Sequence, residues 1–262
     1  MNLSANAEGT PSWRNLSGNA IKWIAIAAML TDHIAWAFVP TYSVLGQIMH
    51  IIGRITGPTM CFFISEGYAH TRNVKKYLFR LGIFAVIAQI PYQLFETGRL
   101  GLRIAPCGFS VIFTLFLSLL AVVAYDRIEN GALRTLAIVG LCLLSTLGDW
   151  MCFDVIFTLI FWTNRGNFRK QALNFTFAAT VMVLLMTLSE IGGGGRIWGE
   201  LFQFAVLLCL PILFFYSGKR GGGGRCSKWA FYIFYPVHLL IIALIAHPNL
   251  WQWSLAHLRI PA

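Results

Sequence analysis

Among the ionisable residues in two long apolar stretches between Lys22 and Arg72, five are candidates for chemistry. These residues are Asp32, His33, Arg54, Glu66 and His70. An ionised side chain at the centre of a membrane helix costs roughly 2.5–3.5 kcal/mol on insertion scales, so such residues are functional candidates by default. Histidine titrates near neutral pH and suits a general base, whereas arginine suits an anion or a developing oxyanion. The residue types therefore favour proton or group transfer within a membrane.

The helical rise predicts which of these residues meet. At ~1.5 Å per residue, Asp32 lies ~18 Å and Arg54 ~20 Å from the same membrane face if their helices run antiparallel. We therefore expect a buried ion pair between them. His33 is rotated by about 100° from Asp32 around the helix and must point elsewhere. In the last apolar segment His238 follows Pro236 and lies about 14 Å from the start of the segment.

These positions describe a polar column through a helical bundle. From the inner to the outer mouth its expected members are Glu66 and His70, then Arg54 and His238, then Asp32 and His33, and lastly Asp149 and Asp154. Structural alternatives stay open, since the ion pair could only hold helices together and His238 could be a satisfied core histidine. Glu66 and His70, spaced i,i+4, could be an interfacial pair. We expect structural or interfacial roles for His50, His247 and His257.

The composition indicates what kind of fold surrounds these residues. Hydrophobic residues make up 57% of the 262-residue chain and charged residues 11%, with a mean hydropathy of +0.68. Soluble domains carry about 25% charged residues, which excludes a soluble globular class. The expected fold is an all-α, polytopic membrane bundle of about nine spans, between eight and ten.

The candidate spans are apolar runs separated by short polar loops. They cover 20–38, 45–69, 74–94, 107–125, 132–148, 150–163, 171–189, 198–216 and 229–247. The segment 150–163 is shorter than the roughly 20 residues that a perpendicular span needs. We expect it to be re-entrant or buried among other helices, where polar backbone is tolerated at membrane depth.

The basic residues predict the orientation of the bundle. The formal net charge is +10, but these residues lie almost wholly in short loops, a pattern that requires no nucleic-acid partner. Fifteen lysines and arginines fall on the side of the N-terminus and four on the opposite side. We therefore expect a cytoplasmic N-terminus and a C-terminus on the outer side.

Three regions are expected along the chain: a flexible polar segment at 1–19, one multi-span membrane domain at 20–250 and a short tail at 251–262. The first apolar run lacks a small-residue cleavage site, so we expect a retained span. Two GGGGR loops, at 192–196 and 221–225, are expected to be flexible connectors. The six cysteines are scattered singly, so we expect neither a metal site nor a disulfide framework.

Four stretches carry a family resemblance. They are KWIAIAAMLTDHIAWAF, IIGRITGPTMCFFISEGYAHT, QIPYQLF at 89–95, and FFYSGKRG followed by KWAFYIFYPVHLL. Together they resemble the TraX family, membrane proteins named for the acetylase of conjugative F-type pilin. The resemblance covers nearly the whole chain, from Lys22 to about Leu240, and extends to multi-span acyltransferases that use cytoplasmic acyl-CoA. The family's polar motif positions correspond to Asp32, His33, Arg54, Glu66, Tyr235 and His238.

The resemblance implies a multi-pass acyltransferase of the bacterial inner membrane. It implies acetyl-CoA or another acyl-CoA as donor, no metal, and most simply the amino terminus of a periplasm-facing, pilin-type protein as acceptor. The implied catalytic residues are His33 or His238 as base, Arg54 held by Asp32 at the oxyanion or substrate charge, and Glu66. Donor and substrate binding is expected at Lys75, Lys76, Arg80, His70, Arg169, Lys219, Arg220 and Tyr235. His33 could instead carry the acyl group covalently.

Two other classes of function fit the same residues. A small transporter or proton-coupled permease would also place His and Asp in a polar column, although no inverted internal repeat is visible. A non-catalytic factor for pilus or conjugation assembly would use the charges only to pack helices. For an acyltransferase, the acceptor stays open between a pilin amine, a glycan hydroxyl, a lipid and a small amine, as does the acyl chain length.

Overall fold

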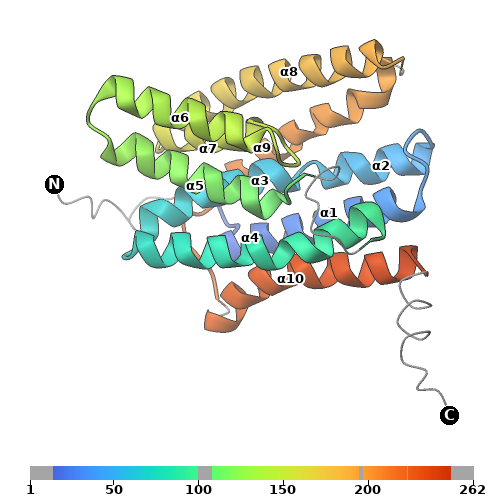
Figure 1. Ribbon diagram of the computed structural model, residues 1–262. Coiled ribbons are helices and arrows are strands. Elements are labelled where there is room, and N and C mark those ends of the chain that lie inside the picture. Colours follow the sequence, from blue (N-terminus) through green and yellow to red (C-terminus); the bar gives the residue numbers. More distant parts are fainter. Residues whose placement is uncertain (1–13, 100–107, 195–196, 223, 249–262) are drawn as a thin grey trace.

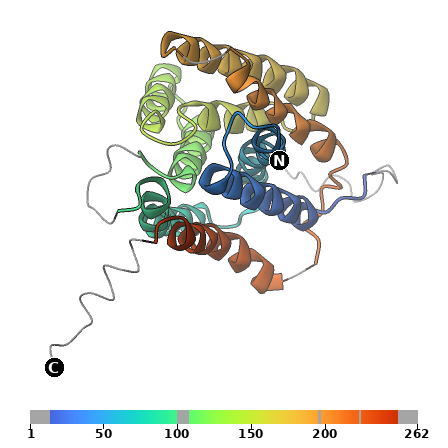
Figure 2. The same ribbon diagram turned by 90° about the vertical axis from the view of Figure 1, so that its right-hand side faces the viewer.

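The computed structural model of the protein describes residues 14–99, 108–194, 197–222 and 224–248. Over these ranges it is helical apart from two isolated β-bridges, which confirms the predicted all-α fold. The long helices lie roughly side by side, with α8 (Phe168–Gly192) and α10 (Gly224–Ala246) on opposite sides of the bundle (Figures 1 and 2). The expected C-terminal tail and the first thirteen residues lie outside the described residues.

Each predicted apolar segment corresponds to one helix or to two consecutive helices. Besides α8 and α10, the helices are α1 (Gly18–Phe38), α2 (Val44–Gly53), α3 (Thr56–His70), α4 (Val74–Thr97), α5 (Val111–Arg127), α6 (Gly131–Ser145), α7 (Phe153–Thr163), the 3₁₀-helix η1 (Ile197–Leu208) and α9 (Cys209–Phe214). Among the residues that the structure describes, five segments are long and apolar enough to cross a membrane, namely α1, Val44–His70, α4, α8 and Trp229–Ala246. The chain is therefore a multi-pass membrane protein.

Polar caps determine where several helices begin. Ser17, Ser43, Asn73, Asn130 and Asn167 each precede a helix and accept a hydrogen bond from a backbone N–H in its first turn. Short polar side chains are favoured there because they satisfy N–H groups that have no partner within the helix. The starts of α1, α2, α4, α6 and α8 therefore follow from single residues.

A break separates α2 from α3, where the sequence predicts one continuous segment. Pro58 lies four residues after Arg54 and lacks the N–H that would bond the Arg54 carbonyl. The chain instead turns at Arg54 and Ile55, and α3 begins at Thr56. The predicted segment 45–69 therefore consists of two consecutive helices, and Arg54 lies at a helix end.

α3 lies at the centre of the bundle, in contact with α1, α5, α7, α9 and η1. Its Phe62 ring packs edge-on against Phe161 of α7, with centroids 5.5 Å apart. Phe161 in turn stacks on Phe175 of α8 at 5.3 Å, and both rings are almost fully buried. Because aromatic rings bury large areas, this stack fixes the side of α3 that faces α7 and α8.

The start of α1 is docked onto the loop that follows α9. The backbone N–H of Asn19 donates to the Arg220 carbonyl at 2.9 Å. Gly221 has a φ of +83°, and a Cβ there would lie 2.4 Å from the Ser17 hydroxyl, so only glycine fits. Parts of the expected flexible N-terminal segment and of the second GGGGR connector are therefore held in place.

Candidate functional site

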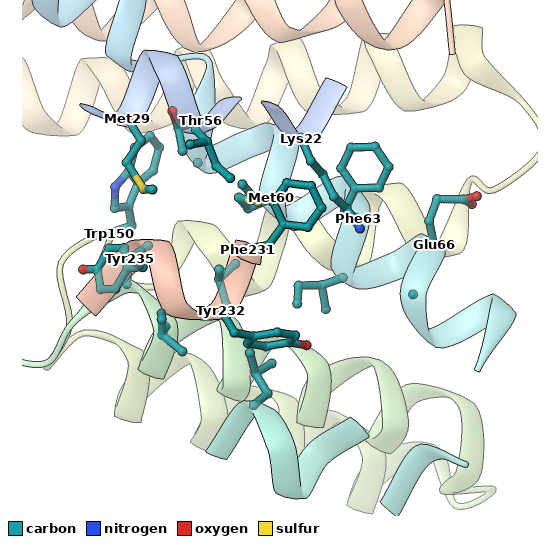
Figure 3. Close-up of a pocket in the computed structure, with 18 of the residues that line it drawn as sticks. Lys22, Met29, Thr56, Met60, Phe63, Glu66, Trp150, Phe231, Tyr232 and Tyr235 are labelled. Atoms are coloured by element: carbon teal, nitrogen blue, oxygen red, sulfur yellow. The ribbon is translucent and has the colours of Figure 1, made fainter. Parts of the chain in front are cut away.

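A cavity of about 910 Å³ lies mainly between α1, α3, α4, α5 and α10. Side chains line it along the length of α1, from Gly18 to Trp36, and along the length of α3. Figure 3 shows Lys22 and Glu66 toward one end of this cavity and Tyr235 toward the other. Its volume falls within the range of about 300–1,000 Å³ that is typical of small-molecule sites.

The cavity brings together most of the site residues predicted from the sequence. Those that line it are Asp32, His33, Arg54, Glu66, His70, Arg80, Arg220 and Tyr235. His238 is not part of the wall but contacts it through His33. Four predicted donor-binding residues, Lys75, Lys76, Arg169 and Lys219, are exposed and do not line the cavity. The cavity thus follows the predicted polar column, whereas those four residues lie elsewhere.

Asp32 binds two residues at the C-terminal end of α2. One carboxylate oxygen accepts a hydrogen bond from His50 Nδ1 at 2.8 Å, and the other forms an ion pair with Arg54. The side chains are buried, so the predicted Asp32–Arg54 pair is confirmed. A Cβ at Gly53 would lie only 2.3 Å from the Asp32 side chain, so this approach requires glycine.

Arg54 is also held from η1. Its Nη1 donates to Gln203 Oε1 at 3.3 Å, and its guanidinium lies over the rings of Trp150 and Phe202, at 5.3 and 5.5 Å from their centroids. Gln203 donates in turn to Glu200 at 3.0 Å. A buried charge is costly unless it is paired, and these contacts hold the guanidinium on the cavity wall.

His50, for which the sequence predicts a structural or interfacial role, belongs to this network. It is fully buried, and its ring packs against Trp36 at 4.3 Å and Phe202 at 5.1 Å. Its i,i+4 spacing to Arg54 places both side chains on the same side of α2. That spacing is the sequence signal by which the contact of His50 with Asp32 could have been predicted.

His33 and His238 form a direct hydrogen bond between α1 and α10. His33 Nδ1 lies 2.8 Å from His238 Nε2, and His238 Nδ1 lies 2.7 Å from the Phe234 carbonyl oxygen. A carbonyl only accepts, so a neutral His238 carries its proton on Nδ1 and accepts at Nε2. His33 then donates from Nδ1, and the lone pair on its Nε2 stays free. The two histidines therefore differ: His33 is on the cavity wall with an unprotonated nitrogen, and His238 sets its tautomer.

Aromatic rings hold this histidine pair. Tyr235 packs edge-on against His33 at 6.2 Å and His238 at 5.7 Å between centroids. Phe95 of α4 packs edge-on against His33 at 5.4 Å, and Phe234 stacks on His238 at 4.7 Å. The imidazoles are thereby fixed in orientation by α4 and α10.

Two carboxylates, Glu96 and Asp149, also line the cavity. The sequence predicts Asp149 near the outer mouth but does not identify Glu96. The predicted segment stops at residue 94, whereas α4 continues to Thr97 and carries Glu96 into the wall. These carboxylates make this part of the cavity suitable for a cationic group.

Asp154, also expected at the outer mouth, lies in the core instead. It is fully buried, and it accepts hydrogen bonds from the Thr114 hydroxyl and the Cys61 thiol. It does not line the cavity. The prediction for Asp154 is wrong because the first turn of α7 directs the carboxyl toward α3 and α5.

Glu66 lies toward the same end of the cavity as Lys22 and interacts with residues of two other segments. Its carboxylate is 2.8 Å from Arg165 Nε and 3.5 Å from the Tyr216 hydroxyl, which donates to it. His70 Nδ1 donates to the Glu66 backbone carbonyl at 2.8 Å, and its side chain is 60% exposed. These contacts fit the interfacial alternative for Glu66 and His70, with Arg165 as an additional partner.

Gln89, in the QIPYQLF stretch, has a structural role. Its side-chain nitrogen donates to the Gly108 carbonyl at 2.9 Å, and its oxygen accepts from the Ser110 N–H at 3.0 Å. Gln89 therefore holds the chain in place at the start of α5. It is not part of the cavity wall.

Within the described ranges, no group of three or more His, Cys, Asp or Glu residues has a geometry suited to a metal ion. Cys61, Cys142, Cys152 and Cys209 are free thiols. Cys107 lies outside the described residues, as does the side chain of Cys226.

Comparison with known proteins places these features in a family. Residues 17–246 match the family model described as "TraX protein". The chain is also 35% identical, over 239 residues, to a protein of Dichelobacter nodosus described as "Probable fimbrial assembly protein FimC, serogroup H1". That match covers 87% of this chain and 96% of the relative. No solved structure matches the chain.

Proposed function

The chain belongs to the TraX family, and from that premise we propose that it is a multi-pass membrane acyltransferase. The donor is acetyl-CoA or a longer acyl-CoA, entering at the end of the cavity where the basic residues gather. The acceptor enters from the other membrane face. The name of the Dichelobacter nodosus relative refers to fimbrial assembly, which favours a pilin-type amino terminus as acceptor and the bacterial inner membrane as location.

One observation carries this proposal. A single cavity joins a basic end, lined by Lys22, Arg80 and Arg220, to a wall that holds His33 and the Asp32–Arg54 pair. An anionic donor fits the first part and proton transfer fits the second. A reaction between two substrates is accelerated when the protein holds both of them in a fixed geometry beside the catalytic groups.

In the proposed reaction His33 is the base. The acceptor nitrogen attacks the thioester carbonyl carbon and forms the new C–N bond while His33 Nε2 takes a proton from the amine. The C–S bond breaks, and the coenzyme A thiolate takes the proton back from His33. Arg54, held by Asp32, stabilises the negative charge that develops on the carbonyl oxygen. Glu96 and Asp149 attract the protonated acceptor amine into the cavity, and one of these carboxylates takes the first proton, which frees the nitrogen lone pair for the attack.

A second candidate is a non-catalytic assembly factor, which the name of the relative also favours. In that case the Asp32–Arg54 pair and the histidine pair only join helices. The two candidates differ in one measurable property, because only the acyltransferase consumes acyl-CoA.

The test is acetyl transfer by the purified protein in nanodiscs. Acetyl-CoA and a synthetic peptide with a free amino terminus are supplied, and coenzyme A release and peptide mass are measured. The proposal predicts an N-acetylated peptide with the natural chain and none with His33→Ala. Absence of coenzyme A release with the peptide and with glycan, lipid and small-amine acceptors would favour the assembly factor.

A further inference from the structure

Three cations from separate parts of the chain converge at one end of the cavity. Lys22 comes from α1, Arg80 from α4 and Arg220 from the loop before α10, and all three line the wall. The hydrogen bond from Asn19 N–H to the Arg220 carbonyl places that loop beside the first turn of α1, one turn from Lys22. Lys22 and Arg80 lie against two adjacent residues of α10, Phe231 and Tyr232.

This positive charge has no internal counter-charge. Among the described residues, none of the three cations forms an ion pair with a carboxylate. Glu66, the carboxylate that lines this end, is already paired with Arg165. Like charges that are brought together inside a protein raise its free energy unless an anion joins them.

Aromatic rings hold Lys22 and Arg80 in place, whereas the exposed Arg220 donates to the Gly224 carbonyl at 3.0 Å. Lys22 Nζ lies 4.7 Å from the centroid of Phe63 and 5.5 Å from that of Phe231. Arg80 lies 5.3 Å from the ring of Tyr77 and 5.1 Å from that of Tyr232, and its Nε is buried without a hydrogen-bond partner. Cation–π contacts of this kind position a charge without neutralising it. The site is therefore preorganised for an anion.

We propose that Lys22, Arg80 and Arg220 form a clamp for the diphosphate at the end of a pantetheine arm. This inference rests on the proposed function and specifies how the donor lies. Arg80 and Arg220 are two of the donor-binding residues predicted from the sequence. The clamp adds Lys22 to them and leaves out the four predicted residues that do not line the cavity.

The distance from Lys22 to His33 indicates which anionic group of the donor binds the clamp, namely the diphosphate. Lys22 and His33 are eleven residues apart on the same helix, so their Cα atoms lie about 16 Å apart along its axis. The pantetheine arm has twelve bonds between its phosphate oxygen and its sulfur, which corresponds to about 14 Å of extended chain. With the diphosphate at Lys22, the thioester carbon therefore reaches His33.

The test measures binding of coenzyme A, 4′-phosphopantetheine, pantetheine and inorganic pyrophosphate to the protein in nanodiscs of zwitterionic lipid. The clamp predicts that phosphopantetheine binds at least about tenfold more tightly than pantetheine, since charge-assisted hydrogen bonds are strong. Lys22→Met and Arg80→Gln should each remove most of this preference and leave pantetheine binding unchanged. Lys170→Met removes one exposed charge from the same side of the protein and should change none of these affinities.

The natural occupant of the clamp could also be a lipid phosphate. In that case nanodiscs with anionic lipid would compete with phosphopantetheine, and this result would overturn the assignment to the donor.

The outcomes separate the clamp from the proposed function. If coenzyme A binds and the preference for phosphopantetheine survives in both variants, the clamp is wrong and the acyltransferase proposal stands. If pyrophosphate binds through Lys22 and Arg80 but no acyl-CoA is consumed, the anion site stands and the acyltransferase proposal fails. If neither coenzyme A nor pyrophosphate binds, both are wrong. Unchanged thermal unfolding of each variant shows that the loss is not one of folding.

Discussion

His33 and His238 share one hydrogen bond, yet their positions give them different roles. His33 lines the cavity, and its Nε2 lone pair is free because Nδ1 donates to His238. His238 is engaged on both nitrogens, by His33 and by the Phe234 carbonyl. In the proposed reaction His33 is therefore the catalytic base and His238 a positioning residue.

Substitutions should distinguish these two roles. His33→Ala is expected to lower the single-turnover rate by roughly 10²–10⁴-fold, the usual contribution of a general base. His238→Ala should cost less, and His238→Gln should restore much of the rate because its side-chain oxygen can accept from His33 Nδ1. Rapid-quench measurement at saturating donor gives the rates. Equal rates for His238→Ala and His238→Gln would contradict the positioning role.

The Asp32–Arg54 pair predicts non-additive effects on folding. Asp32→Asn or Arg54→Gln alone leaves an uncompensated buried charge and should destabilise the protein by roughly 3–5 kcal/mol. The double variant should recover much of the folded yield but not the activity. Glu66→Gln with Arg165→Gln is the control, because Arg165 is 42% exposed and such pairs contribute about 0–1 kcal/mol. Additive losses at Asp32 and Arg54 would contradict a coupled pair.

At the scale of elements, the break between α2 and α3 brings Arg54 to Asp32. Pro58 ends the hydrogen-bond ladder at Arg54, and Gly53 lets α2 approach the Asp32 side chain. α1 and α2 cross closely at this point because no Cβ separates them. The ion pair thus depends on two residues that carry no charge.

Gly53 should therefore resist even the smallest substitution. Gly53→Ala places a Cβ 2.3 Å from Asp32 and is expected to destabilise the protein by on the order of 1–3 kcal/mol. Gly140→Ala in α6 is the matched control, since nothing lies within 4 Å of its added Cβ. Thermal unfolding in detergent compares the two variants. A Tm for Gly53→Ala equal to that of Gly140→Ala would show that the close approach is not required.

The helices and the central ion pair could be predicted because both follow from local periodicity. Apolar runs indicate helices, and the rise per residue places Asp32 and Arg54 at equal depth. The packing of distant segments could not be predicted in this way. Lys22 lines the cavity beside Phe231 of α10, whereas the Asp154 carboxyl is bound by Thr114 and Cys61 in the core. These contacts join residues from different helices that lie far apart in the sequence. The periodicity of a single segment contains no information about such contacts.

At the scale of the whole molecule, the loop charges predict the topology. Fifteen basic residues on the side of the N-terminus and four on the other predict an odd number of crossings. A reporter that works only outside the cytoplasm should therefore be active when fused after Ala262, and a cytoplasmic reporter fused there should be inactive. The converse result would mean that one apolar segment does not cross, with α7 (Phe153–Thr163) the first to consider because of its length.

In the proposed reaction the donor binds at the basic end of the cavity with its thioester beside His33, and an acceptor from the other membrane face takes the acyl group there. The most direct test uses proteoliposomes of known protein orientation, with labelled acetyl-CoA on the face of the basic loops and a peptide with a free amino terminus on the opposite face. We predict that label reaches the peptide with the natural chain, and that His33→Ala binds the donor equally well but transfers label at least about 100-fold more slowly. Transfer at the natural rate by His33→Ala, or failure of the natural chain to bind the donor, would contradict the account.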